Sequence, residues 1–246
     1  MDLTRTHVLV ADGPAMRRLA AEPPRSPDDR ARLHGMRSAA ARLRFCAGRA
    51  LVTRLLGLAG APTATRIVPD ERGRPRLDPP VGLAVSISHT RTWAAAAVVA
   101  GDRCGVDVEE RLDPERFTQA ALRSFLPEGW AGRLAGRPDP AEELTRSWVL
   151  LEAALKWRGT GFSAPLDELR FRRTGDGAHV AERLGGRATR VEARSLAGGA
   201  MLAVSTAPHA ARPRVTFVDG PAGPAADGTS PAHQTPRVPL TSTTKG

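Results

Sequence analysis

Residues 139–161 read DPAEELTRSWVLLEAALKWRGTG, a stretch that predicts one long amphipathic helix. Asp139 suits the capping position, Pro140 suits the first turn, and Glu142 completes a capping pattern. Gly159 favours termination of the helix at its other end. The apolar residues that recur at helical spacing predict its buried face: Leu144, Trp148, Leu151 and Leu155. We expect the rest of the fold to be organised around this helix.

Glu152 and Lys156 lie four residues apart, so they share one face of this helix at the margin of the apolar residues. Such a pair often only stabilises the helix, by about 0.2–0.5 kcal/mol. The chain, however, uses arginine for nearly all of its positive charge, because among 36 basic residues only Lys156 and Lys245 are lysines. A compact ammonium at position 156 therefore favours a functional site over a surface ion pair.

The charge of the chain is distributed unevenly. At 246 residues the chain is long enough for one large domain or two small lobes, and its net charge is +10. Residues 1–104 carry +8, residues 105–206 carry 0 and residues 207–246 carry +2. A cationic first half suits an anionic partner, either a nucleic acid, a phosphorylated small molecule or an acidic protein. The Pro, Gly, Ala, Ser and Thr content from residue 207 onward predicts a disordered tail over 207–246, in which residues 215–218 are apolar enough to pack.

Several classes of function are excluded by the sequence. It contains no tyrosine, and Cys46 and Cys104 have neither disulfide-framework nor metal-ligand spacing. No apolar run is long enough to span a bilayer, and the first residues lack a signal-peptide layout, so we expect a cytoplasmic protein that binds no membrane. The P-loop pattern, the nucleophile elbow of hydrolases, paired metal-ligand histidines and a DNA-reading helix-turn-helix are absent from the sequence.

Residues 71–78, ERGRPRLD, predict a constrained turn in which Gly73 and Pro75 restrict the backbone. The turn presents three arginines: Arg72, Arg74 and Arg76. Arginine matches phosphate oxygens with a rigid fork of donors, so the turn suits phosphate recognition. An ordinary exposed turn would have the same composition.

Two predicted strands end in chemically useful side chains. Residues 83–88 alternate apolar and small polar residues, lead into Ser88 and His89, and return as an apolar strand over 93–100, which predicts a hairpin with His89 at its tip. Residues 105–110, GVDVEE, place Asp107 and Glu109 on one face of a strand. Two neighbouring carboxylates repel each other unless a cation lies between them, and carboxylates are suitable ligands for Mg²⁺. The alternative is an exposed strand face that carries acids.

The remaining elements are predicted from weaker patterns. Strands are expected at residues 6–11, 66–68, 164–173, 189–194 and 200–206, helix at residues 29–56, and loop with some helix at residues 13–28.

Four motifs in this order resemble the 4′-phosphopantetheinyl transferases, in particular the larger two-lobed type that activates peptide and polyketide synthases. They are GRP at 73–75, SISH at 86–89, GVDVE at 105–109 and WVLLEAALKWRGTG at 148–161. The segment RFCAGRALVTRLLG at 44–57 resembles the arginine-containing helix of that family's first lobe. The resemblance implies an α+β fold of two similar lobes, residues 1–104 and 105–206, with coenzyme A in the cleft between them. Each lobe of this pseudo-dimer would be a small antiparallel sheet packed on a long helix.

The resemblance also implies roles for individual residues. The Mg²⁺ ligands would be Asp107, Glu109 and Glu152. The residues in contact with coenzyme A would be Ser88 and His89 at a phosphate, Arg44, Arg49 and Arg74 at the nucleotide end, and Lys156 at the pyrophosphate. The catalytic residues would be Glu152, Lys156 and His89, with Glu152 as the base.

The implied reaction transfers 4′-phosphopantetheine from coenzyme A to a serine of an apo acyl or peptidyl carrier protein and releases 3′,5′-ADP. We expect a monomer that binds no nucleic acid. Position 151 departs from the family pattern, because Leu151 stands where the family usually has lysine. This departure favours a second hypothesis, a non-catalytic relative that only binds coenzyme A or a carrier protein. A third hypothesis is a basic nucleic-acid-binding module with salt-sensitive affinity.

Overall fold

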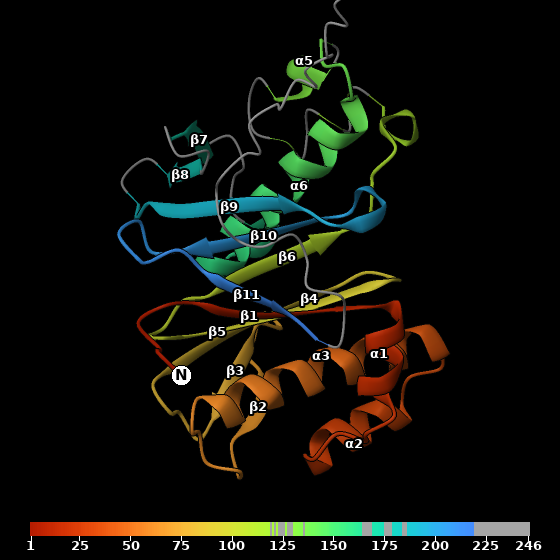
Figure 1. The fold of residues 1–246 in the computed structure, drawn as a ribbon, viewed down its shortest axis with the longest axis vertical. Helices are drawn as coiled ribbons and strands as arrows, with labels where there is room; N and C mark the ends of the chain where they lie inside the picture. Colours follow the sequence, from red (N-terminus) through yellow and green to blue (C-terminus); the bar gives the residue numbers. More distant parts are fainter. Residues whose placement is uncertain are drawn as a thin grey trace, which may run out of the picture.

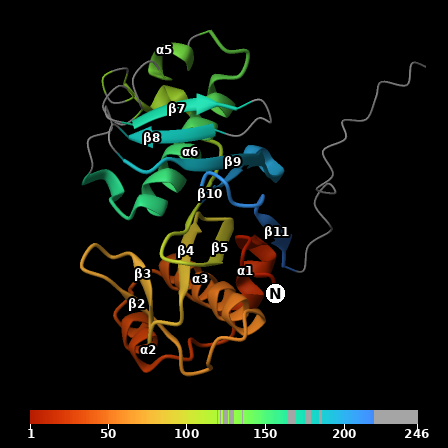
Figure 2. The same ribbon diagram turned by 90° about the vertical axis from the view of Figure 1, so that its left-hand side faces the viewer.

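The computed structural model describes residues 1–118, 120, 122, 126, 130–134, 136–163, 169–174, 179–183 and 186–218. The fold is α+β, with two stacked sheets between helices (Figure 1). Figure 2 shows the same two halves from the side, with α3 in one half and α6 in the other. Among the described residues, no helix is long and apolar enough to cross a membrane.

The first half is built on a four-stranded sheet with the order β11-β1-β5-β4. Its strands are β1 (His7–Asp12), β4 (Leu83–His89), β5 (Trp93–Ala100) and β11 (Arg214–Phe217). Its helices are α1 (Gly13–Ala20), α2 (Pro27–His34) and α3 (Ala39–Leu58), and a separate hairpin consists of β2 (Arg66–Pro69) and β3 (Pro75–Asp78). Helices α1 and α3 bury Met16, Leu51 and Leu55 against strand residues such as Val85 and Val98.

The second half is built on a five-stranded antiparallel sheet with the order β6-β10-β9-β8-β7. Its strands are β6 (Gly105–Glu109), β7 (Leu169–Arg173), β8 (His179–Arg183), β9 (Thr189–Ser195) and β10 (Met201–Thr206). Its helices are α5 (Trp130–Leu134) and α6 (Pro140–Arg158), with short 3₁₀ turns at Pro114–Arg116, Gly161–Ser163 and Ala197–Gly199. Helix α6 buries Leu144, Leu151 and Leu155 against residues that include Val191 and Met201.

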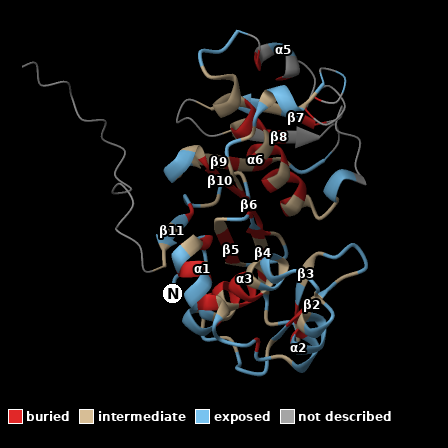
Figure 3. Ribbon diagram, turned by 90° about the vertical axis from the view of Figure 1, so that its right-hand side faces the viewer, coloured by how far each residue is buried: buried red, intermediate tan, exposed pale blue. Residues whose placement is uncertain are grey.

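The two sheets pack against each other through small apolar side chains. Val8 and Val10 of β1 belong to one buried cluster with Val106 and Val108 of β6 and Leu202 of β10. In Figure 3 the buried residues concentrate on α3, α6 and the strands between them. This arrangement brings the end of β4 beside β6, and α6 packs on the face of β6 that carries Asp107. The candidate site lies where these three elements meet.

The strongly patterned elements match their predictions, and so do the strands predicted at residues 6–11, 66–68, 189–194 and 200–206. The predicted helix around residues 139–161, the hairpin of β4 and β5, and β6 are confirmed. The predicted helical region over residues 29–56 forms two helices, α2 and α3, and the first half of the proline-rich segment before it forms α1. The first part of the strand predicted at 164–173 lies outside the described residues.

The predicted disorder of residues 207–246 is wrong for residues 207–218, whereas the expected packing of residues 215–218 is confirmed. Arg214–Phe217 forms β11, which pairs in parallel with β1 from His7↔Arg214 to Val10↔Phe217. A strand of four residues carries too little alternation to be recognised, and its backbone partners come from the distant end of the chain. Residues 219–246 of that prediction lie outside the described residues.

Candidate active site

Helix α6 carries two of the candidate residues and is capped as its ends predict. Asp139 accepts a hydrogen bond from the backbone N–H of Glu142 at 2.9 Å, and Gly159 ends the helix with φ 72°. The side chain of Glu142 does not complete the predicted capping pattern, because its Oε1 accepts a hydrogen bond from Arg146 at 2.7 Å. Both ends of α6 are therefore defined by local residues, an aspartate side chain at the start and a left-handed glycine at the end.

Gly105, the first residue of β6, allows α6 to approach the sheet closely. A Cβ atom on Gly105 would lie 2.2 Å from the carbonyl oxygen of Ala153 and 2.8 Å from the backbone nitrogen of Trp157. These atoms belong to the helix backbone, so only glycine permits this contact. The close approach places the turn of α6 that carries Glu152 and Lys156 against the β6 face that carries Asp107.

An ionic cluster forms where α6, β6 and β4 meet. Lys156 Nζ lies 2.6 Å from Asp107 Oδ1 and 3.6 Å from Glu152 Oε2. Ser88 Oγ donates a hydrogen bond of 2.7 Å to the same Asp107 Oδ1. The side chain of Asp107 is 4% exposed, against 29% for Lys156 and 23% for Glu152. The cluster is thus buried at the aspartate and open to solvent at the helix.

The carboxylates of the cluster destabilise one another, and the ammonium compensates. Burial raises the pKa of Glu109 to about 7, and the negative charges of Asp107 and Glu152 add to this effect. Burial and Asp107 also raise the pKa of Glu152, although Lys156 opposes the shift. Burial disfavours the charged form of Lys156, but Asp107 and Glu152 outweigh burial and raise the pKa of its ammonium. The cluster has an excess of negative charge that favours a further cation.

Whether a divalent cation fits this cluster depends on its carboxylate oxygen atoms. Among the described residues, no group of three His, Cys, Asp or Glu side chains is arranged to hold a metal ion. Asp107 Oδ2 is nevertheless buried and has no hydrogen-bond partner, whereas a buried carboxylate oxygen is normally paired. Oxygen donors of this kind suit Mg²⁺, which keeps several waters and needs only one or two protein carboxylates. The unpaired Asp107 Oδ2 therefore suits such an ion, although the described carboxylates are not grouped around one point.

His89 lies beside this cluster at the exposed end of β4. Desolvation lowers the pKa of its imidazole, and the positive charges of Arg44 and Lys156 lower it further. Arg44 of α3 is thus close enough to share a field with His89 and Lys156. Direct contacts join Ser88, Asp107, Glu152 and Lys156 where β4 meets the face of β6 that packs against α6. The charges around them act on His89 and Glu109, and Arg44 acts on His89.

Arg74 approaches the same helix from the β2–β3 hairpin. Its Nη2 donates a hydrogen bond of 2.8 Å to the carbonyl oxygen of Asp102, and its Nη1 lies 2.5 Å from the place of a Cβ on Gly159. Desolvation lowers the pKa of Arg74, and the neighbouring Arg76 and Arg103 act in the same direction. The first half of the molecule therefore contacts the C-terminal end of α6 through a partly buried guanidinium.

Arg49 lies apart from the other predicted residues. Its Nε donates to Asp29 Oδ1 at 3.0 Å, and its guanidinium lies over the Phe45 ring at 5.0 Å from the centroid. Arg44 and Arg49 are five residues apart, which turns them by about 140° around an α-helix. Arg49 therefore faces the α2 side of α3, and the structure does not bring it to the cluster that contains His89. The spacing within the helix carried this signal, since residues five apart do not share a face.

Leu151 is fully buried in the core between α6 and the second sheet. A lysine at this position would place an ammonium among apolar side chains, so Leu151 serves packing. The structural role of Gly105 was not predicted from the sequence. The same holds for the hydrogen bond that the backbone N–H of Val106 donates to Ser86 Oγ at 3.0 Å. The alternation within β4 places Ser86 and Ser88 on one face, and this pattern was the available signal for hydrogen bonds between β4 and β6.

The ionic cluster lies where elements of the two halves meet, since Ser88 of β4 and Lys156 of α6 both contact Asp107 of β6. Two family models match the chain: the 4′-phosphopantetheinyl transferase N-terminal domain over residues 34–99, and the 4′-phosphopantetheinyl transferase superfamily over residues 103–205. The chain belongs to the 4′-phosphopantetheinyl transferase superfamily. Comparison with curated proteins gives no match. Membership assigns a transferase activity on phosphopantetheine, with coenzyme A as the co-substrate that the family generally uses.

Proposed function

We propose that this chain transfers 4′-phosphopantetheine from coenzyme A to a serine of an apo acyl or peptidyl carrier protein, in a reaction that depends on Mg²⁺ and releases 3′,5′-ADP. The observation that carries the proposal is Asp107 Oδ2, a buried oxygen without a partner beside Glu109 and Glu152. An unsatisfied carboxylate oxygen at that position is explained by a cation that the reaction supplies. Asp107, Glu109 and Glu152 would hold Mg²⁺, whose charge, when bound, would offset that of the pyrophosphate.

The two lobes would divide the work of binding. Residues 1–104 would bind the nucleotide end of coenzyme A through Arg44 and Arg74, and residues 105–206 would provide the carboxylates. Ser88 and His89, at the end of β4, would contact a phosphate. The cationic charge of the first region and the neutral charge of the second support this division. The position of Arg49 beside Asp29 removes the support for its part in the same subsite.

Glu152 and Lys156 would act at the reacting phosphate. The oxygen of the carrier serine forms a bond to the β-phosphorus of coenzyme A, and the bond from that phosphorus to the bridging oxygen of 3′,5′-ADP breaks. The proton of the serine passes to Glu152, the carboxylate proposed as the base. Lys156 places a positive charge beside the oxygens on which negative charge increases.

The test is intact-protein mass spectrometry of several apo carrier proteins incubated with the enzyme, coenzyme A and Mg²⁺. We expect a phosphopantetheine adduct on at least one carrier. No adduct should form when EDTA is present, and excess Mg²⁺ should restore its formation. A panel without adducts, on carriers that another transferase modifies, would contradict the proposal and support a non-catalytic relative. Undiminished transfer in EDTA would contradict the role of Mg²⁺ alone.

A further inference from the structure

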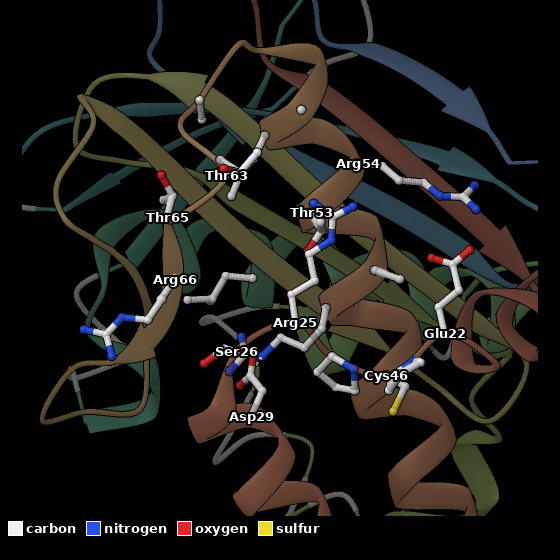
Figure 4. A pocket seen from close by; sticks show the side chains of 18 of the residues that line it. Glu22, Arg25, Ser26, Asp29, Cys46, Thr53, Arg54, Thr63, Thr65 and Arg66 are labelled. Carbon is white, nitrogen blue, oxygen red and sulfur yellow. Dashed lines mark hydrogen bonds and ion pairs between the residues drawn. The ribbon is translucent and has the colours of Figure 1, made fainter.

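A polar pocket lies in the first half of the molecule, between α2, α3 and the segment that leads into β2 (Figure 4). Its volume is about 260 Å³, and its walls contain four arginines against two carboxylates. The arginines are Arg25, Arg49, Arg54 and Arg66, and the carboxylates are Glu22 and Asp29. The α3 residues that line the pocket lie on the side of the helix that faces away from Arg44 and His89. The pocket is therefore a different place from the ionic cluster at α6.

Arg49 is the buried cation of this pocket. Only 8% of the residue is exposed, and burial lowers the pKa of its guanidinium, although Asp29 opposes that shift. Its Nε donates to Asp29, and within the described part of the chain neither Nη1 nor Nη2 donates a hydrogen bond. A guanidinium has five donors in a fixed fork, so Arg49 has donor capacity that Asp29 does not use.

Further donors of the pocket are also unused. Thr65 Oγ1 is buried and has no hydrogen-bond partner. Arg25 and Arg54 are exposed, and neither side chain forms an ion pair with the described residues. In the view of Figure 4, Arg25 lies between Thr53 and Asp29, Thr65 lies to one side, and Arg54 lies on the other side near Glu22. Hydroxyl and guanidinium donors thus line the same small space.

We propose that this pocket binds the phosphate group of a small molecule, at a site separate from the coenzyme A site. Arginine forks and threonine hydroxyls are the donors that phosphate oxygens need, and Arg66, which is paired with Asp28 and Asp78, closes one wall. The small volume suits a compact phosphorylated compound or inorganic phosphate. The unsatisfied hydroxyl of Thr65 is explained by an acceptor that arrives with the ligand.

The experiment measures the affinity for inorganic phosphate by isothermal titration calorimetry, in chloride buffers of constant ionic strength, without coenzyme A, metal or carrier protein. The double variant Arg25→Ala/Arg54→Ala should bind phosphate at least about fivefold more weakly than the unaltered protein. Arg37→Ala, an exposed arginine outside the pocket, is the matched control and should bind normally. Absence of saturable phosphate binding to the unaltered protein, or equal affinity in the double variant, would overturn the proposal.

Thr65→Val provides a second test that does not depend on charge. The change removes the hydroxyl at nearly constant shape, so thermal stability should be equal or higher while phosphate affinity falls. Equal phosphate affinity in Thr65→Val would overturn the part of Thr65 in binding.

The KM for coenzyme A separates this site from the proposed transferase site. In the double variant we expect an unchanged KM. A rise in KM that parallels the loss of phosphate affinity would show that the pocket holds the nucleotide end of coenzyme A, which would overturn a separate site. Loss of phosphate binding with intact transfer in the double variant leaves the proposed function untouched. Failure of the unaltered protein to transfer phosphopantetheine, with its phosphate binding intact, leaves this proposal untouched.

Discussion

Each half of the molecule presses one long helix against one sheet through a glycine, but the two contacts differ in kind. In the first half, Gly48 on α3 would place a Cβ 2.9 Å from Ile87 Cγ2, the tip of a side chain. In the second half, Gly105 on β6 would place a Cβ 2.2 Å from the backbone oxygen of Ala153 on α6. A side chain can rotate away, whereas a helix backbone must move as a unit. The rigid contact lies beside the turn of α6 that carries Glu152 and Lys156, whereas the adaptable one lies between α3 and the residue before Ser88.

The largest expected effect concerns a carboxylate, because α6 carries glutamates and α3 carries no acidic residue. Glu152→Gln should reduce transfer by about 10²–10⁴-fold, the range that positioned base catalysis usually provides, without loss of the fold. Glu143→Gln is the matched control, since it makes the same change on the same helix, next to Arg137 and outside the cluster. The measurement is initial rate with coenzyme A, Mg²⁺ and an apo carrier protein. Near-normal turnover of Glu152→Gln would remove Glu152 from the mechanism.

The second prediction compares the two glycine contacts directly. Gly105→Ala should lower the free energy of unfolding by about 3 kcal/mol, at the upper end of overpacking, because the backbone of α6 must shift. Gly48→Ala should change it by less than about 1 kcal/mol, since the gain from alanine in a helix offsets the movement of Ile87. Denaturant unfolding of both variants measures the difference. Equal losses would show that the two contacts are equivalent after all.

The third prediction compares the left-handed glycines that follow the two long helices. Gly60 after α3 has φ 72° and open space around it, whereas Gly159 after α6 has φ 72° and touches Arg74. Gly60→Ala should cost about 1–2 kcal/mol from backbone strain alone. Gly159→Ala should cost about 1 kcal/mol more, because Arg74 must leave its hydrogen bond to Asp102. Thermal unfolding of the two variants decides it, and a smaller loss for Gly159→Ala would exclude the contact with Arg74 as a stabilising one.

The smallest expected effect concerns the N-terminal caps, which are a serine in α3 and an aspartate in α6. Ser38 accepts from Ala41, and Asp139 accepts from Glu142. The side chain of Arg111 and the backbone N–H of Glu142 lower the pKa of Asp139 below its ordinary value. Because the pKa is lower in the folded state, the stabilisation by Asp139 is complete above about pH 4 and is lost as the pH falls through the folded-state pKa.

Asp139→Asn keeps a capping oxygen without a titrating group, so it should flatten this part of the acid limb at pH values below about 4. Ser38→Asp should add such a limb to the first half. Thermal midpoints across this pH range are the measurement, and identical acid limbs in the unaltered protein and Asp139→Asn would argue against a titrating cap.

The sequence predicts the elements whose periodicity is long or strict. Helix α6 and strands β4, β5 and β6 follow directly from spacing, and the positions of Asp107 and Glu152 on facing elements follow from the family resemblance. The alternation of β6 also predicts correctly that Val106 and Val108 share one buried face, since both lie in the cluster between the sheets. Local pattern and burial agree at these places, so the sequence was sufficient.

What could not be predicted depends on contacts between distant residues. The partner of Arg49 is Asp29, twenty residues earlier, and the pair forms only because α2 packs beside α3. Lys156 was assigned to pyrophosphate, and in the structure its shortest contact is Asp107, since Gly105 lets helix and strand approach closely. Strands β3, β8 and β11 are short, and their stability comes from pairing with a neighbour rather than from their own composition.

Strand β11 has a consequence for any dissection of this protein into fragments. The chain leaves the second half after β10 and returns to lie beside β1, so Arg214–Phe217 completes a sheet whose other strands precede residue 101. A fragment that stops at residue 104 would leave one side of β1 with unpaired amide and carbonyl groups, which invites self-association. Supplying residues 212–218 as a separate peptide would restore the missing neighbour, so the two pieces are suited to a complementation assay.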